Sequence, residues 1–364
     1  MSLETGTLAR EVGRSFGGLH VSPSAPRCRA RVALAAVAVL AACSPARAED
    51  SCPRILRQDP ALNNLVDPPG STTAPLGTLG GVTRAGTGSQ PMILVPGFGF
   101  GGDVFDDLTK ALAADFRTYA VTLPGMAGTA APPAPSETTS FGEQTWTAAA
   151  EGAIEKLIES ENLKRPVVVG HWLGGTQIAL RLAEKRPEAV RAVILLAGSA
   201  RMLPSDPAQA AYIATPEKRV ASVDHYMAPR WFKTVTRETW DDNNFLPGDY
   251  AVNPVRGLRL WREAARPPLH VWVRYLCEFN AQDACVDLPK LAVPTLLLEP
   301  GLEGHEPDPG GDYMKGYLHD SWAGCVESQP KITVKRIPNA RVGVWFDQPQ
   351  AVVGAIREFL AGVE

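Results

Sequence analysis

The stretch that decides the fold reads Arg165-Pro166-Val167-Val168-Val169-Gly170-His171-Trp172-Leu173-Gly174-Gly175. Its β-branched run, 167–169, predicts a short buried strand, and the apolar spacing after the double glycine predicts a helix. Gly170 and Gly174 stand two residues before and two after Trp172, which lets the strand and the helix cross closely. Trp172 is therefore expected on a strained turn that projects above the sheet.

This strand–turn–helix pattern resembles the nucleophile elbow of the α/β-hydrolase family, whose sequence is Gly-x-Ser-x-Gly. Trp172 stands where the resemblance places the nucleophilic serine. The segment 337–349, Ile-Pro-Asn-Ala-Arg-Val-Gly-Val-Trp-Phe-Asp-Gln-Pro, resembles the family's histidine segment, with Val342 in the place of the histidine. An indole is no nucleophile and an isopropyl group accepts no proton, so ordinary serine hydrolysis is not expected.

Alternating strands and helices extend over most of the chain. Strands are expected at 91–95, 118–122, 167–169, 190–196, 294–298 and 331–336, and helices at 104–114, 147–160 and 350–360. The resemblance covers about 91–361 and implies an α/β-hydrolase fold: a mostly parallel sheet of about eight strands with helices on both faces. We expect the core at 91–200 and 290–364, and an aromatic-rich helical cap at 201–289.

The N-terminal segment has the pattern of an export signal. Three arginines between 27 and 31 precede an apolar run, 32–42, whose 11 residues are too few to span a bilayer. Leu40-Ala41-Ala42-Cys43 resembles a bacterial lipoprotein box, and Ala46-Arg47-Ala48 resembles an ordinary cleavage site. We therefore expect a leader at 1–48, an extended arm at 49–90, and a periplasmic protein or an outer-membrane lipoprotein anchored at Cys43.

Cysteine usage agrees with an oxidising compartment. Outside the leader the chain has Cys52, Cys277, Cys285 and Cys325. Short spacing favours a Cys277–Cys285 disulfide, with Cys52–Cys325 as the remaining pair, and four unpaired thiols are the alternative.

Composition excludes some partners. The 364 residues carry a net charge of −3, so no basic face for nucleic acid is expected. No Cys-x-x-Cys motif and no histidine cluster points to a metal, and we expect no cofactor. Aromatic side chains in the cap indicate a small hydrophobic ligand.

The resemblance also assigns the remaining site positions. It places an oxyanion hole at the backbone N–H groups of Phe98 and Leu173, and the catalytic acid at or near Glu303, with Glu299 as the alternative. Trp172 and Val342 would then line the ligand pocket. His305, two residues from Glu303, and His171, beside the elbow, are the candidates for relocated acid–base chemistry, and Ser199 is a candidate for a relocated nucleophile.

Three functional hypotheses follow. The first is an exported protein with a lidded apolar pocket that binds or transforms a small hydrophobic molecule without a Ser-His-acid triad. The second is a hydrolase of esters or amides with a relocated nucleophile, and the third is a non-catalytic envelope scaffold.

Overall fold

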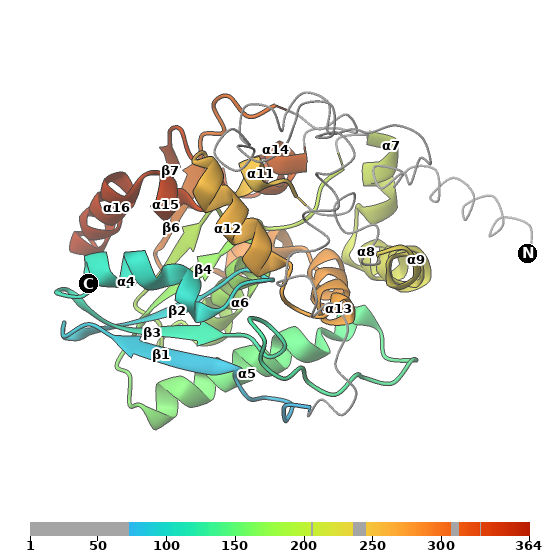
Figure 1. Cartoon of the computed structure of the whole chain (residues 1–364), viewed down its shortest axis with the longest axis horizontal. Helices are drawn as coiled ribbons and strands as arrows, with labels where there is room; N and C mark the ends of the chain where they lie inside the picture. The colour runs from blue at the N-terminus through green and yellow to red at the C-terminus, as the bar shows by residue number, and fades with distance from the viewer. Residues whose placement is uncertain (1–72, 205–206, 236–244, 307–312, 328) are drawn as a thin grey trace, which may run out of the picture.

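The computed structural model describes residues 73–204, 207–235, 245–306, 313–327 and 329–364. Within them a seven-stranded sheet has the order β1-β3-β2-β4-β5-β6-β7 (Figure 1). The edge strand β1 (Gly81–Ala85) runs antiparallel to β3, and all other neighbours are parallel. The remaining strands are β2 (Gln90–Val95), β3 (Phe116–Thr122), β4 (Val167–His171), β5 (Ala192–Leu196), β6 (Thr295–Pro300) and β7 (Ile332–Ile337).

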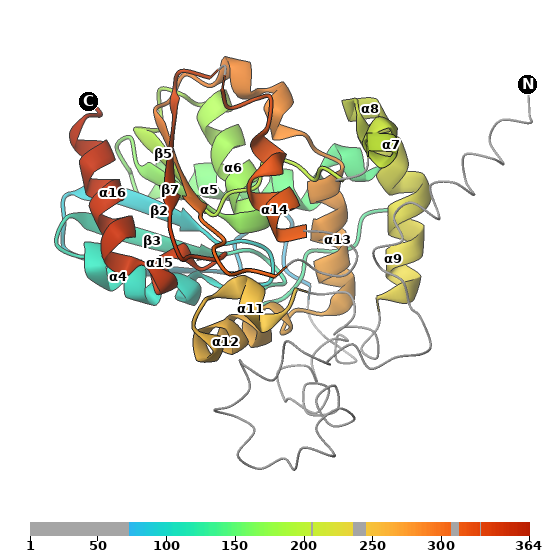
Figure 2. The same ribbon diagram turned by 90° about the horizontal axis from the view of Figure 1, so that it is seen from above.

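Helices cover both faces of this sheet. Figures 1 and 2 show α4 (Asp106–Leu112) and α16 (Pro349–Ala361) on one face, and α5 (Thr145–Ser160) and α6 (Trp172–Lys185) on the other. Strands β4 and β5 are buried along their whole length, which explains why their sequences are almost continuously apolar. The α/β-hydrolase fold expected from the sequence is therefore confirmed.

A helical cap connects β5 to β6. Its longer described helices are α8 (Pro216–Ser222), α9 (Ala228–Thr234), α12 (Pro254–Ala264) and α13 (Leu269–Asn280), and its shorter pieces are α7 (Pro207–Ala210), η6 (Ala211–Ile213), η7 (Val223–Met227), α11 (Pro247–Tyr250), η8 (Ala284–Val286) and η9 (Leu288–Lys290). After β6 come α14 (Tyr313–Leu318) and η10 (Asp320–Trp322), and after β7 comes α15 (Val344–Asp347).

A buried carboxylate joins the cap to the core. Glu278 of α13 accepts hydrogen bonds from the backbone N–H groups of Trp146 and Thr147, at 3.1 and 2.8 Å, and from Arg274 Nε at 3.2 Å. These N–H groups belong to the first turn of α5, where a negative charge is favourable. The cap is thus held over the carboxyl ends of the strands by α13.

One expected boundary needs correction. Residues 81–85 form β1 rather than part of an extended arm, because their backbone pairs with β3 although the segment lacks apolar alternation. The sheet in the described part of the chain has seven strands, in agreement with the mostly parallel sheet of about eight strands that was expected.

The expected disulfide pairing is also wrong. Cys285 bonds to Cys325, with Cα atoms 5.5 Å apart, while Cys277 is a free, buried thiol. Cys277 lies on the face of α13 that packs against Val223 and Trp231 of the cap, and Cys52 lies outside the described residues. No helix of the described part is both long enough and apolar enough to cross a membrane.

Candidate functional site

The elbow between β4 and α6 has the strained backbone that the glycine spacing predicts. Trp172 has a φ of 51°, an uncommon conformation for a bulky side chain. Gly174 has a φ of 84°, and a Cβ atom there would lie 2.1 Å from the ring of Phe98. A Cβ atom at Gly170 would lie 2.4 Å from the carbonyl oxygen of Gly175, so both glycines are needed where strand and helix cross.

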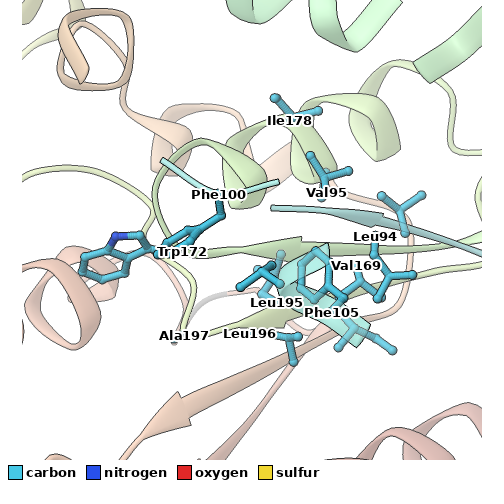
Figure 3. Close-up of a cluster of buried hydrophobic side chains, with 14 of the residues drawn as sticks. Leu94, Val95, Phe100, Phe105, Val169, Trp172, Ile178, Leu195, Leu196 and Ala197 are labelled. Atoms are coloured by element: carbon cyan, nitrogen blue, oxygen red, sulfur yellow. The ribbon is translucent and has the colours of Figure 1, made fainter. Parts of the chain in front are cut away.

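The side chain of Trp172 fills the position at the tip of the elbow. It is 2% exposed, and its ring centroid lies 5.5 Å from that of Phe245 and 5.8 Å from that of Tyr317. Figure 3 shows the indole at one end of the buried core, pointing away from the strands. Phe245 precedes α11 of the cap and Tyr317 belongs to α14, so segments far apart in sequence close over the tip of the elbow.

The expected oxyanion hole is not formed. Leu173 has a ψ of 132° instead of a helical value, and this turns its carbonyl toward the loop after β2. The N–H of Phe98 donates to that carbonyl oxygen at 3.0 Å. One of the two expected donors, the N–H of Phe98, is therefore engaged within the protein and is not available to a ligand in this arrangement.

His171 has the environment of a structural residue. Its Nδ1 accepts the N–H of Gly97 at 3.2 Å, and its ring packs against those of Phe100, Phe105 and Trp345. Burial lowers the pKa of His171 to about 3. The imidazole is neutral at physiological pH and is a very weak base, which argues against the acid–base role considered from the sequence.

The loop around Val342 docks the cap. Val342 is buried, and its N–H donates to the carbonyl of Asp249 at 3.4 Å. The next N–H, of Gly343, donates to the carbonyl of Tyr250 at 2.8 Å. The backbone of this loop thus holds α11 in place.

Glu303 lies beside this loop. Its carboxylate is exposed to solvent and accepts the N–H of Asn339 at 2.6 Å, which keeps its pKa below the usual range. The carboxylate that sequence reasoning offered as the catalytic acid therefore stabilises the loop at Asn339.

His305 forms a pair that the sequence did not reveal. Its Nε2 lies 2.6 Å from Oδ1 of Asp249, and both side chains are under 10% exposed. Asp249 belongs to the cap and is 56 residues away, so no local spacing pointed to it. Phe245 was one of many aromatic residues expected in the cap and had no signal of its own, and Tyr317 lies on α14, outside the expected cap.

Ser199 does not have the surroundings of an activated nucleophile. Its side chain is fully buried, and its Oγ has no hydrogen-bond partner among the described residues. Since no base contacts it there, nothing in this part of the chain would remove its proton. The described residues also hold no group of three or more His, Cys, Asp or Glu side chains suited to a metal ion.

Comparisons with known proteins agree with the fold. Residues 92–355 match the model of the alpha/beta hydrolase family, and the chain belongs to that family. The esterase RhEst1 from Rhodococcus sp. ECU1013 is similar in structure, with a TM-score of 0.56 and 18% identity over 78% of this chain and 94% of that one. The esterase EaEST from Exiguobacterium antarcticum has a TM-score of 0.55 and 14% identity, over 77% of this chain and 95% of that one.

Two further similarities differ in extent. A bromoperoxidase from Bacillus anthracis has a TM-score of 0.53 and 19% identity, over 77% of this chain and 94% of that one. The polyketide synthase ThaQ from Burkholderia thailandensis is 30% identical over 141 residues, which are 37% of this chain and 6% of that protein. At these identities the solved structures show the fold alone.

Proposed function

We propose that this protein is a non-hydrolytic member of the family that binds a small hydrophobic molecule between the elbow and the cap. The observation that carries the proposal is the backbone bond from Phe98 N–H to the Leu173 carbonyl, combined with the burial of Trp172 at the nucleophile position. Together they engage one donor of the expected oxyanion hole within the protein and replace the nucleophile with an apolar surface.

The aromatic side chains around Trp172 support an apolar ligand. Phe245, Tyr317 and Phe279 come from three separate segments, and their rings pack in tilted or edge-on contacts at centroid distances of 5.7 and 6.1 Å. A flat apolar molecule that displaces Phe245 would keep such contacts with Trp172 and Tyr317. Ligand binding then requires only a side-chain and cap rearrangement and no reactive group.

Equilibrium dialysis against 2-methoxynaphthalene, which has no hydrolysable bond, tests this proposal. We expect saturable binding that changes the tryptophan emission, and we expect Trp172→Phe to remove most of that change. Phe245→Ala should alter the Kd by at least fivefold, while Phe232→Ala, at an exposed ring on α9, should leave it unchanged. The proposal would be contradicted if no saturable binding were found, or if neither Trp172→Phe nor Phe245→Ala altered the binding.

A second candidate is acid–base catalysis by His305 paired with Asp249. A carboxylate that holds an imidazole in one orientation supports proton transfer in many enzymes, and the 2.6 Å contact has that form. Such an activity would be lost in His305→Gln and in Asp249→Asn, whereas binding of 2-methoxynaphthalene would persist. Equal loss of binding in both variants would indicate a purely structural pair.

We further propose that the protein is exported and anchored through Cys43. The basic and apolar residues of 27–42 support export, and the Cys285–Cys325 disulfide fits an oxidising compartment. Intact-mass analysis of the full chain expressed in a bacterium is expected to show a diacylated or triacylated Cys43. An unmodified protein that begins at Glu49 would instead indicate ordinary signal cleavage, and Cys43→Ala is the matched control.

A further inference from the structure

Five polar side chains are buried beside the elbow without partners for their oxygen atoms. They come from four segments: Thr176 and Gln177 of α6, Ser199 after β5, Asn280 at the end of α13, and Ser321 of η10. Each is at most 2% exposed, and none of the oxygens in question has a hydrogen-bond partner among the described residues. We call these five residues the polar cluster.

Direct contacts show that the four segments meet. Trp322 Nε1, next to Ser321, donates to the carbonyl of Gly198 at 2.9 Å, and a Cβ atom at Gly198 would lie 2.9 Å from Thr176 Oγ1. Gln177 Nε2 donates to the carbonyl of Phe279 at 3.4 Å, which brings α6 to the end of α13. The residues that follow α13 then pair with the chain after β5, through a 3.1 Å bond from Ala284 N–H to the carbonyl of Ala200.

The two carboxamides of the polar cluster have fixed orientations. Asn280 Nδ2 donates to the carbonyl of Leu276 at 2.7 Å, and Gln177 Nε2 donates to the carbonyl of Phe279. Each amide nitrogen donates a hydrogen bond to a carbonyl, which identifies the other atom of the carboxamide as the oxygen. Asn280 Oδ1 and Gln177 Oε1, which have no partner among the described residues, are therefore hydrogen-bond acceptors. The cluster therefore needs hydrogen-bond donors, and the three hydroxyl groups beside it both donate and accept.

The polar cluster borders the aromatic side chains at the elbow. Phe279, whose carbonyl receives the Gln177 bond, has its ring 6.1 Å from that of Tyr317, which in turn lies 5.8 Å from Trp172. A molecule with its apolar body against Trp172 and Tyr317 would thus be separated by one residue, Phe279, from the Gln177 carboxamide of the polar cluster.

We infer that the ligand is amphipathic, with an apolar ring system and one hydrogen-bond-donating polar group, such as a hydroxyl, that binds the polar cluster. This inference rests on the proposed function and adds the chemical class of the ligand. A carboxylate head is disfavoured because it has no hydrogen to donate to the amide oxygens of Gln177 and Asn280. These oxygens would stay unpaired beside its negative charge. An alcohol both donates to an amide oxygen and accepts from Ser199 or Thr176.

The test compares two isomers that share a naphthalene ring, 2-naphthalenemethanol and 2-methoxynaphthalene, together with 2-naphthoate. Only the alcohol has a donor. In equilibrium dialysis of the unmodified protein, we expect the alcohol to bind about tenfold more tightly than the ether, the effect of one additional hydrogen bond, and the carboxylate to bind more weakly than either.

Substitutions in the polar cluster test whether its residues cause the preference for the alcohol over the ether. Ser199→Ala and Gln177→Met should each reduce the alcohol-to-ether ratio to threefold or less, while the affinity for the ether stays within twofold. The matched control is Ser222→Ala on α8, which removes another buried hydroxyl that lacks a partner among the described residues and lies outside the polar cluster. It should leave the ratio unchanged.

The outcomes separate the two proposals. Equal binding of alcohol and ether, an unchanged ratio in both cluster variants, or tight binding of 2-naphthoate would overturn the assignment of the polar cluster and leave the proposed function standing. Failure of the ether and the alcohol alike to bind would overturn the proposed function itself. Occupation of the cluster by water alone would give equal binding of the two isomers, and this result also counts against the inference.

Discussion

The elbow around Trp172 and the loop around Val342 each bury an apolar side chain, but their backbones differ. At the elbow, Trp172 has a positive φ, and the following peptide is turned so that the Leu173 carbonyl meets Phe98. Val342 has a negative φ, and its loop uses ordinary backbone N–H groups to hold the cap.

The difference shows that burial of an apolar side chain does not by itself impose strain. The elbow is strained because the crossing of β4 and α6 requires a positive φ whatever residue is present. The loop around Val342 has no such strain, since the φ of Val342 is negative. Substitutions should therefore affect the two regions in opposite ways.

The largest expected effect is at Gly174. Gly174→Ala combines a left-handed φ with a collision against the Phe98 ring, and we expect the free energy of unfolding to fall by about 4 kcal/mol in urea titrations. Gly152→Ala in α5 is the control, because an added Cβ there has no heavy atom within 4 Å, and it should stabilise the protein by about 0.5 kcal/mol. Two equally stable variants would contradict the described elbow.

Substitutions of Trp172 test the strain directly. Trp172→Ala should reduce the free energy of unfolding by about 3 kcal/mol, since it empties the space under Phe245 and Tyr317. Trp172→Gly should be less damaging than Trp172→Ala by about 1 kcal/mol, because glycine adopts a φ of 51° without strain. If the glycine variant proved the less stable of the two, the elbow would not be strained.

Val342 should show the reverse order. Val342→Ala is expected to cost about 2 kcal/mol through the loss of buried methyl groups, and Val342→Gly about 1 kcal/mol more, because its backbone gains nothing from glycine. Chemical denaturation of the two variants supplies the measurement. Better tolerance of glycine at position 342 would remove the contrast with the elbow.

The pH dependence of stability reports on His171. Its imidazole stays neutral in the folded protein down to a pKa of about 3, whereas the unfolded chain takes up a proton near 6.5. The unfolded state then binds more protons between these values, so the stabilising contribution is complete above pH 6.5 and declines as the pH falls toward 3.

The expected difference is measurable. Between pH 7.5 and 5 the stability difference between the unmodified protein and His171→Gln should shrink by about 2 kcal/mol. Urea titrations at the two pH values provide the comparison, with His171→Asn as a second variant. A pH-independent difference would mean that the folded imidazole titrates as in water.

Much of the frame of this site was predictable because it depends on local patterns. Three consecutive valines determine a buried strand, and the spacing of Gly170 and Gly174 determines the turn around Trp172. The retained segment 337–349 likewise located the loop around Val342. These features depend on short-range sterics and on apolar periodicity, which a single sequence contains.

The rest depends on contacts between distant segments. The orientation of the Leu173 carbonyl is determined by Gly174 and by the partner at Phe98, 75 residues earlier in the chain. The pairing of Cys285 with Cys325 and of His305 with Asp249 follows from how the cap lies on the core. No spacing rule reaches across these separations.

The central claim is that the protein has no activated nucleophile, and intact-mass analysis after exposure to an alkyl fluorophosphonate tests it most directly. The purified protein, treated beside an active serine esterase as a positive control, is predicted to keep its original mass. One added phosphonyl group that maps to a single residue, at Ser199 or elsewhere, would contradict the account and would show that a hydrolytic centre exists in this chain.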